Sequence, residues 1–243
     1  MTFKYWQNHA LYWRDFILDL IFPKECVGCG QEGSWLCPSC YQKLEFSKVQ
    51  YCLNCKTENN SGEFCPNCRN EYYLDGVTIV GNYDDKIINH LIKMLKYHFI
   101  KDVAIILGNY LVDFLQKTHN LPILKITKIP IVIPVPLHKR RRRWRGFNQT
   151  KEIAEITAKH FQLKINATNL IRIKHKKAQA KLNEEQRLKN VAGCFAWRGE
   201  NLTGANIILI DDVVTTGATL NECAKILKQN GASQVWGMVI AKG

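Results

Sequence analysis

The chain lacks any apolar run long enough to cross a membrane. Its N-terminus also lacks the basic region, apolar core and small-residue cleavage site of a secretory signal. We therefore expect a cytoplasmic protein with no transmembrane segment.

Acidic residues are scarce, since the chain has 21 Asp and Glu against 34 Lys and Arg, which gives a formal net charge of +13. Residues 1–70 are balanced, with seven of each sign, whereas residues 125–190 hold eighteen basic and four acidic residues. Such a field attracts polyanions: nucleotides, pyrophosphate or nucleic acid.

Histidine is absent from residues 26–68, although cysteine is abundant there. Four CxxC pairs follow one another, and two pairs complete a tetrahedral zinc site. A reducing compartment and few large apolar residues favour metal over disulfides, and the lack of histidine favours structural zinc. We expect two sites, with the first pair joined to the second and the third to the fourth; an interleaved pairing is the alternative. The ligands are Cys26, Cys29, Cys37, Cys40, Cys52, Cys55, Cys65 and Cys68. Cys194 and Cys223 are expected in the core.

Composition divides the chain into three parts. Residues 1–22 have the spacing of an amphipathic helix, which we expect to pack on the rest of the protein; contact with a partner or a membrane surface is the alternative. Residues 23–71 are expected to form a small double zinc-ribbon domain around the two zinc sites. Residues 72–243 alternate strand and helix patterns: strands at 77–83, 129–135, 170–173, 207–210 and 235–241, and helices at 84–97, 102–117, 150–161 and 218–230. This alternation predicts an α/β fold with a Rossmann-like parallel sheet.

The most informative segment is 207–220. A buried apolar strand ends in Asp211 and Asp212, and a turn of small residues leads into a helix. Converging backbone N–H groups and the helix dipole suit a phosphate, whereas adjacent carboxylates suit sugar hydroxyls or a divalent cation. The turn is made of Thr215, Thr216, Gly217, Ala218 and Thr219. The segment resembles the phosphoribosyl diphosphate (PRPP) motif of type I phosphoribosyltransferases, although an ordinary strand–turn–helix corner is the alternative.

A basic loop is expected at 138–149, after the strand 129–135. It carries the run Arg140, Arg141, Arg142, Arg143 and Trp144, followed by Arg145 and Gly146. A charge run is usually a solvated surface, but ligands bind at the carboxyl ends of parallel strands. Arg145 and Gly146 are then candidates to grip a leaving pyrophosphate.

A longer set of motifs runs through the chain. It comprises the cysteine pairs, Leu95-Lys96-Tyr97, Pro134-Val-Pro-Leu137, Arg145-Gly-Phe-Asn-Gln149, Gln179, Arg187, Asn190, Gly193, Phe195 and Asp211–Thr219. This set resembles the ComF family of competence-associated, phosphoribosyltransferase-like proteins over nearly the whole length. The resemblance implies a type I phosphoribosyltransferase fold, a pyrophosphate loop after the strand 129–135, and a flexible loop at 172–190 with Arg172, Gln179 and Arg187. It also implies PRPP with Mg²⁺ as ligand and a link to natural transformation.

Three functions follow. The first is a phosphoribosyltransferase whose acceptor and catalytic base are unknown. The second is a single-stranded DNA-binding factor, in which Arg140–Arg143 contact phosphates and Trp144, Trp35, Tyr51 or Phe64 stack on bases. The third is a PRPP sensor without turnover that acts through a protein partner of the competence machinery.

Overall fold

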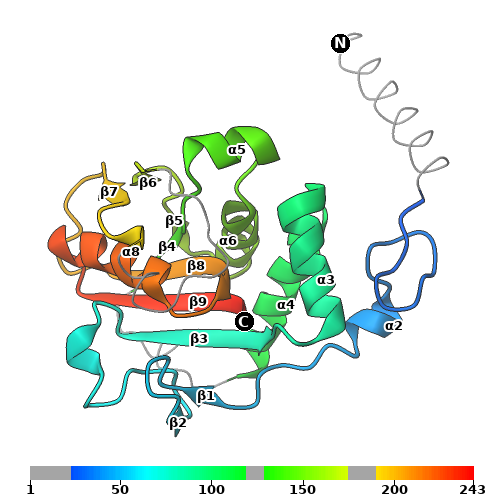
Figure 1. The fold of residues 1–243 in the computed structure, drawn as a ribbon, viewed down its shortest axis with the longest axis horizontal. Coiled ribbons are helices and arrows are strands. Elements are labelled where there is room, and N and C mark those ends of the chain that lie inside the picture. Colours follow the sequence, from blue (N-terminus) through cyan, green and yellow to red (C-terminus); the bar gives the residue numbers. More distant parts are fainter. Residues whose placement is uncertain (1–22, 119–128, 175–189) are drawn as a thin grey trace. The chain divides into compact units, whose positions relative to one another are not determined.

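A five-stranded parallel sheet with the order β3-β9-β8-β4-β5 forms the centre of the larger part of the chain (Figure 1). Its strands are β3 (Gly76–Asn82), β9 (Gln234–Lys242), β8 (Asn206–Val214), β4 (Ile131–Pro134) and β5 (Lys164–Ile165). In β8 and β9 nearly every residue is buried, as expected for strands covered on both faces. The predicted Rossmann-like parallel sheet is confirmed.

The structure is a computed structural model that describes residues 23–118, 129–174 and 190–243. The chain divides into two compact units, one ending at Leu44 and the other running from Glu45 to Gly243. The predicted N-terminal helix 1–22, and Gln179 and Arg187, lie outside the described residues. Within the described ranges, no helix combines the length and hydrophobicity that a membrane crossing requires.

Helices cover the sheet on both faces. The elements after β3 are α3 (Lys86–Lys93), the π-helix η2 (Met94–His98) and α4 (Val103–Lys117). Helix α6 (Gln149–His160) packs on α4, β4 and β8, while α8 (Ala218–Gln229) packs on β8 and β9. These helices match the predicted ranges closely, because each has a regular apolar stripe.

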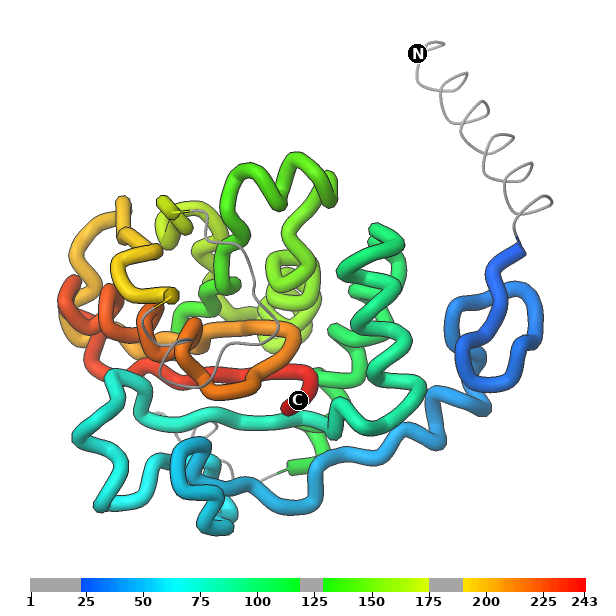
Figure 2. Tube along the Cα trace, viewed as in Figure 1, coloured from blue at the N-terminus to red at the C-terminus, as the bar shows by residue number. Residues whose placement is uncertain are grey.

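The first cysteine pairs lie in the unit that ends at Leu44, which contains the short helix α2 (Pro38–Tyr41). The second ribbon contains β1 (Gln50–Tyr51), β2 (Glu58–Asn59) and η1 (Arg69–Glu71), and it belongs to the unit of the sheet. Figure 2 shows its chain turning alongside β3. The Gln50 side chain donates to the carbonyl of Ile79 and accepts from its N–H, both at 2.9 Å, which satisfies the edge of the sheet.

Two details differ from the sequence prediction. The segment 138–149, expected as a loop, contains α5 (Lys139–Arg145), which is capped by His138 Nδ1 and ends at Gly146 with φ 81°. The strand expected at 170–173 is β6 (Leu170–Arg172), but it pairs antiparallel with β7 (Phe195–Trp197) outside the parallel sheet. Basic residues at every position of α5 except Trp144 gave no helical periodicity, so composition alone favoured a loop.

Candidate functional site

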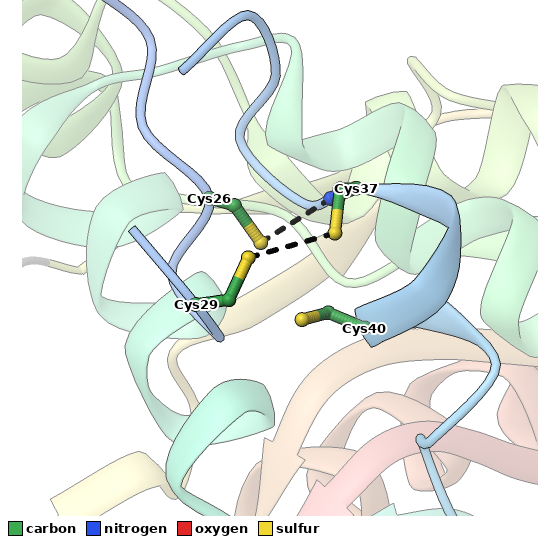
Figure 3. A group of neighbouring side chains, drawn as sticks. All are labelled: Cys26, Cys29, Cys37 and Cys40. Carbon is green, nitrogen blue, oxygen red and sulfur yellow. Dashed lines mark hydrogen bonds between the residues drawn. The ribbon is translucent and has the colours of Figure 1, made fainter. Parts of the chain in front are cut away.

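Each pair of CxxC knuckles brings four sulfur atoms within 4.8 Å of one another. Figure 3 shows Cys26, Cys29, Cys37 and Cys40 converging on one point. The Sγ atoms of Cys29 and Cys37 are 3.7 Å apart, and those of Cys55 and Cys65 are 3.6 Å apart. Ligands at about 2.3 Å from a tetrahedral ion are separated by about 3.8 Å. The structure therefore confirms two structural four-cysteine zinc sites and the pairing of consecutive knuckles.

Hydrogen bonds to sulfur support both sites. The backbone N–H of Cys37 donates to Cys26 Sγ at 3.3 Å, and Asn54 Nδ2 donates to Cys68 Sγ at 3.3 Å. Such donors orient and stabilise thiolate ligands. Cys194 and Cys223 are fully buried, as predicted for core residues.

The two acidic residues at the end of β8 face opposite sides of the sheet, because side chains alternate along a strand. Asp212 is only 4% exposed and has two side-chain partners. Lys96 Nζ lies 2.8 Å from its Oδ1, and Gln149 Nε2 donates to its Oδ2 at 2.9 Å. Asp212 thus holds η2 and the first turn of α6 against the sheet.

Lys96 comes from the π-helix η2, a rare element that is frequently found at functional sites. Burial alone would lower the pKa of Lys96, but the Asp212 carboxylate raises it above its ordinary value. Lys96 therefore keeps its positive charge at neutral pH. Sequence reasoning placed Lys96 and Gln149 in family motifs without a role; no local signal links either residue to Asp212.

Asp211 is half-buried, and its Oδ1 accepts the backbone N–H of Asp212 at 2.9 Å. Burial and the neighbouring Asp212 raise the pKa of Asp211 to about 7, although Lys96 and Arg172 oppose the shift. Asp211 therefore changes its charge close to neutral pH.

The turn after β8 leaves backbone donors available. Gly217, at φ 76°, precedes the first residue of α8, a left-handed conformation that glycine adopts without strain. The N–H groups of Thr215, Thr216 and Gly217 find no acceptor within the part of the chain that the structure describes. Free amides at the start of a twelve-residue helix form a favourable environment for an anion.

Arg145, at the end of α5, is 8% exposed. Its Nε and Nη1 atoms have no hydrogen-bond partner among the described residues, and its guanidinium lies 5.9 Å from the ring of Tyr97. Burial lowers the pKa of Arg145, while the charge of Asp212 opposes that shift. Buried donors without partners are costly and rare in folded proteins, so the Arg145 guanidinium has free capacity for an acceptor such as a water or a ligand oxygen.

The rest of α5 is a cationic surface. Arg140, Arg142 and Arg143 are exposed, and Trp144 is 61% exposed with its ring edge-on to Phe99 at 4.8 Å. The expectation that Phe64 stacks on a base is wrong, because Phe64 is buried and stacks on Tyr72 at 4.2 Å.

The other candidates for base stacking, Tyr51 and Trp35, are partly buried, and so is Arg172 of the predicted flexible loop. Lys242 covers the ring of Tyr51 at 4.6 Å, and Trp35 is half-buried in the first unit. Arg172 ends β6, half-buried over the ring of Phe195 at 5.3 Å.

Comparison with known proteins fits this geometry. Residues 17–72 match the double zinc ribbon domain family, and residues 152–242 match the phosphoribosyl transferase domain family. Competence protein F of Haemophilus influenzae is 31% identical over 85% of this chain and 90% of its own length. The chain belongs to the ComF family.

Two further relatives extend the comparison of this ComF-family protein. Competence protein ComFC of Bacillus subtilis is 28% identical over 81% of the chain and 79% of its own length. DNA utilization protein YhgH of Salmonella typhi is 30% identical over 60% of the chain and 64% of its own length. The ComF-family protein is therefore competence-linked, with a type I phosphoribosyltransferase fold after its zinc ribbons.

The donors and acceptors of this site suit one end of a phosphorylated sugar. Free turn amides and the Arg145 guanidinium can bind phosphate oxygens, while Asp211 offers an acceptor for a hydroxyl group. The two acids are not surrounded by further carboxylates within the described residues, where the only metal-ligand clusters are the two cysteine sites.

Proposed function

We propose that this protein binds Mg-PRPP and transfers its phosphoribosyl group to an acceptor that is not yet identified. The observation that carries the proposal is the buried guanidinium of Arg145, with two unpartnered donors within electrostatic reach of Asp212. A buried cation without an acceptor suits an anionic ligand, and the free turn amides after β8 supply a second anion subsite.

Each part of PRPP is bound by a different group of residues. The Thr215–Thr219 turn binds the 5-phosphate through its amides, and Asp211 accepts a hydrogen bond from a ribose hydroxyl. Asp212 contributes its remaining lone pairs, because Lys96 and Gln149 already occupy one position on each oxygen. Mg²⁺, held mainly by substrate oxygens and water beside the two acids, would neutralise negative charge on the diphosphate. Arg145 stabilises the charge that develops on pyrophosphate as the bond from the anomeric carbon to oxygen breaks and the bond to the acceptor forms.

Replacing Asp211 by asparagine tests the role of this acid. We expect PRPP affinity, measured by calorimetry with Mg²⁺, to fall at least about tenfold at pH 8, because a charge-assisted hydrogen bond is lost. Wild-type affinity should rise from pH 6 to pH 8, as Asp211 ionises near pH 7, and the variant should lack this rise. A wild-type protein that does not bind PRPP at either pH would exclude both the transferase and the sensor.

The same substitution should stabilise the ligand-free protein. The folded-state pKa of Asp211 lies above its ordinary value of 3.8, so its ionisation costs stability increasingly from about pH 4 to pH 7. The Asp211→Asn variant avoids this cost, and we expect its unfolding temperature to be about 5 °C higher at pH 8, with a smaller gain at pH 5. An equal gain at both pH values would show that Asp211 does not titrate as described.

Turnover separates the transferase from the sensor. A transferase releases pyrophosphate from PRPP when its acceptor is present, whereas binding without release in the presence of every nucleobase would favour a sensor acting through a protein partner. Eight thiolate ligands favour a reducing compartment, and we propose the cytoplasm.

A second function, binding of single-stranded DNA, is favoured by the exposed arginines and Trp144 of α5. We expect Arg140→Gln/Arg142→Gln to weaken binding to an oligothymidine at least about tenfold at low salt. The slope of log affinity against log salt should fall by about 1.4, because each phosphate contact contributes about 0.7. Lys86→Gln/Lys93→Gln removes the same charge from exposed positions of α3 and should leave the slope unchanged. An equal loss in both variants would indicate attraction by net charge alone.

A further inference from the structure

The second zinc ribbon contacts the turn that follows β8. Leu53 stands between the ligands Cys52 and Cys55 in the third knuckle, and it is 3% exposed. It belongs to the hydrophobic core that contains Val214 before the turn and Leu220 after it. A Cβ atom added to Gly217 would lie 2.5 Å from Leu53 Cδ2, so the leucine side chain packs directly on the glycine backbone.

A second connection joins the same ribbon to the start of α8. Asn221, in the first turn of this helix, accepts backbone hydrogen bonds from Tyr73 at 2.7 Å and from Leu74 at 3.4 Å. The preceding residue, Tyr72, donates its hydroxyl to Asn54 Oδ1 at 3.0 Å, and Asn54 donates in turn to the zinc ligand Cys68. The second zinc site is thus connected to the start of α8 in two ways: through Leu53, which packs on Gly217, and through the hydrogen bonds that involve Asn54, Tyr72 and Asn221.

The two ribbons differ in this respect. The ligands Cys26–Cys40 belong to the unit that ends at Leu44, whereas Cys52 and Cys68 are part of the same buried cluster as β8 and α8. A zinc ion at the second site fixes the knuckle that carries Leu53, because both flanking cysteines are ligands.

We infer that the second zinc ribbon positions the Thr215–Thr219 turn, with Leu53 as the positioning residue. PRPP affinity then depends on zinc at the second site and not on zinc at the first; this inference rests on the proposed function. Amides bind a phosphate well only when they already point to one place, and a turn built around a left-handed glycine has little stiffness of its own. Packing against Leu53 supplies that stiffness.

A leucine truncation tests the contact. We expect Leu53→Ala to weaken PRPP binding at least about tenfold, while Leu53→Met, which preserves volume, stays within about threefold of wild type. Leu202→Ala is the matched control. Leu202 is buried in the same core, but it lies at the other end of α8, where its backbone N–H donates to the carbonyl of Asn230. The control should lower the unfolding temperature without changing PRPP affinity more than about twofold. Equal affinity losses in the two alanine variants would overturn the inference.

A double-mutant cycle measures the coupling directly. Gly217→Ala places a methyl group against Leu53 in addition to straining the backbone at φ 76°. The clash disappears in the Leu53→Ala background, so the PRPP affinity lost through Gly217→Ala should be at least about threefold smaller there. Losses that multiply independently would show that the two residues do not act through each other.

Two cysteine variants distinguish the zinc sites. Cys26→Ser/Cys29→Ser and Cys52→Ser/Cys55→Ser should each reduce bound zinc from two ions to one per chain, but only the second should abolish PRPP binding. Hydrogen exchange of the Val214–Leu220 amides, measured without ligand, should accelerate only in the second variant. Unchanged exchange there would overturn the inference even if wild-type protein did not bind PRPP. The lack of wild-type binding would by itself refute only the proposed function.

Discussion

Replacing Lys96 by methionine is expected to lower the unfolding temperature of the protein by about 10 °C. The substitution leaves Asp212 buried at 4% exposure without its cation. Removing one member of a buried ion pair costs about 3–5 kcal/mol, and each kcal/mol corresponds to about 2–4 °C for a domain of this size. PRPP binding should be lost as well, because Asp212 and η2 no longer hold one arrangement.

Thermal unfolding of three further variants checks the cause. Lys93→Met changes an exposed lysine of the same helical segment and should cost less than about 1 °C. Lys96→Met/Asp212→Asn removes both charges and should recover most of the lost stability, although not PRPP binding. Asp212→Asn alone leaves the partly buried Lys96 without its carboxylate partner, and it should be about as destabilised as Lys96→Met. If the double variant were as unstable as Lys96→Met, the cost would come from lost packing and not from the unpaired carboxylate.

The sequence predicted best those elements whose informative residues lie close together along the chain. The segment 207–220 carries the strand, the acids, the turn and the start of α8 within fourteen residues, and β8 and α8 lie where the pattern placed them. The four knuckles are similarly local, since each brings two ligands together within four residues. The pattern alone left an interleaved pairing open, and the structure groups consecutive knuckles.

The partners of Asp212 could not be predicted in this way. Lys96 and Gln149 lie on separate helices far from Asp212 in sequence, and their contact depends on how η2 and α6 pack on the sheet. A π-helix adds to the difficulty, because its wider turn rotates Lys96 away from the position that the α-helical period of α3 implies.

The different packing of the two ribbons could not be predicted from the sequence. The spacing and composition of 23–71 are uniform, yet the second ribbon shares a core with β8 and α8 and the first belongs to another unit. The packing of Leu53 on Gly217 and the hydrogen bonds of Tyr73 and Leu74 to Asn221 connect the second ribbon to the turn and to α8. Leucine between two cysteines has no pattern that would identify this contact in advance.

Replacing Arg145 has the second large expected effect: pyrophosphate release falls, while the stability of the protein is kept or rises. Its Nε and Nη1 have no partners among the described residues, so the ligand-free protein carries the cost of desolvating them. Arg145→Met keeps much of the side-chain volume and removes these donors. We therefore expect an unfolding temperature equal to or a few degrees above that of wild type. Pyrophosphate release should fall by about 10²–10³-fold, the usual cost of removing a group that stabilises developing charge.

The direction of the stability change decides between two roles for this arginine. A structural residue would lower both the unfolding temperature and the rate when replaced, whereas a ligand-binding residue lowers only the rate. Lys139→Met, at the exposed start of α5, is the control and should change neither quantity appreciably. Arg145→Lys keeps the charge but not the forked donors, so its rate should remain at least about tenfold below wild type. A strongly destabilised Arg145→Met protein, or one with full pyrophosphate release, would remove Arg145 from the proposed site.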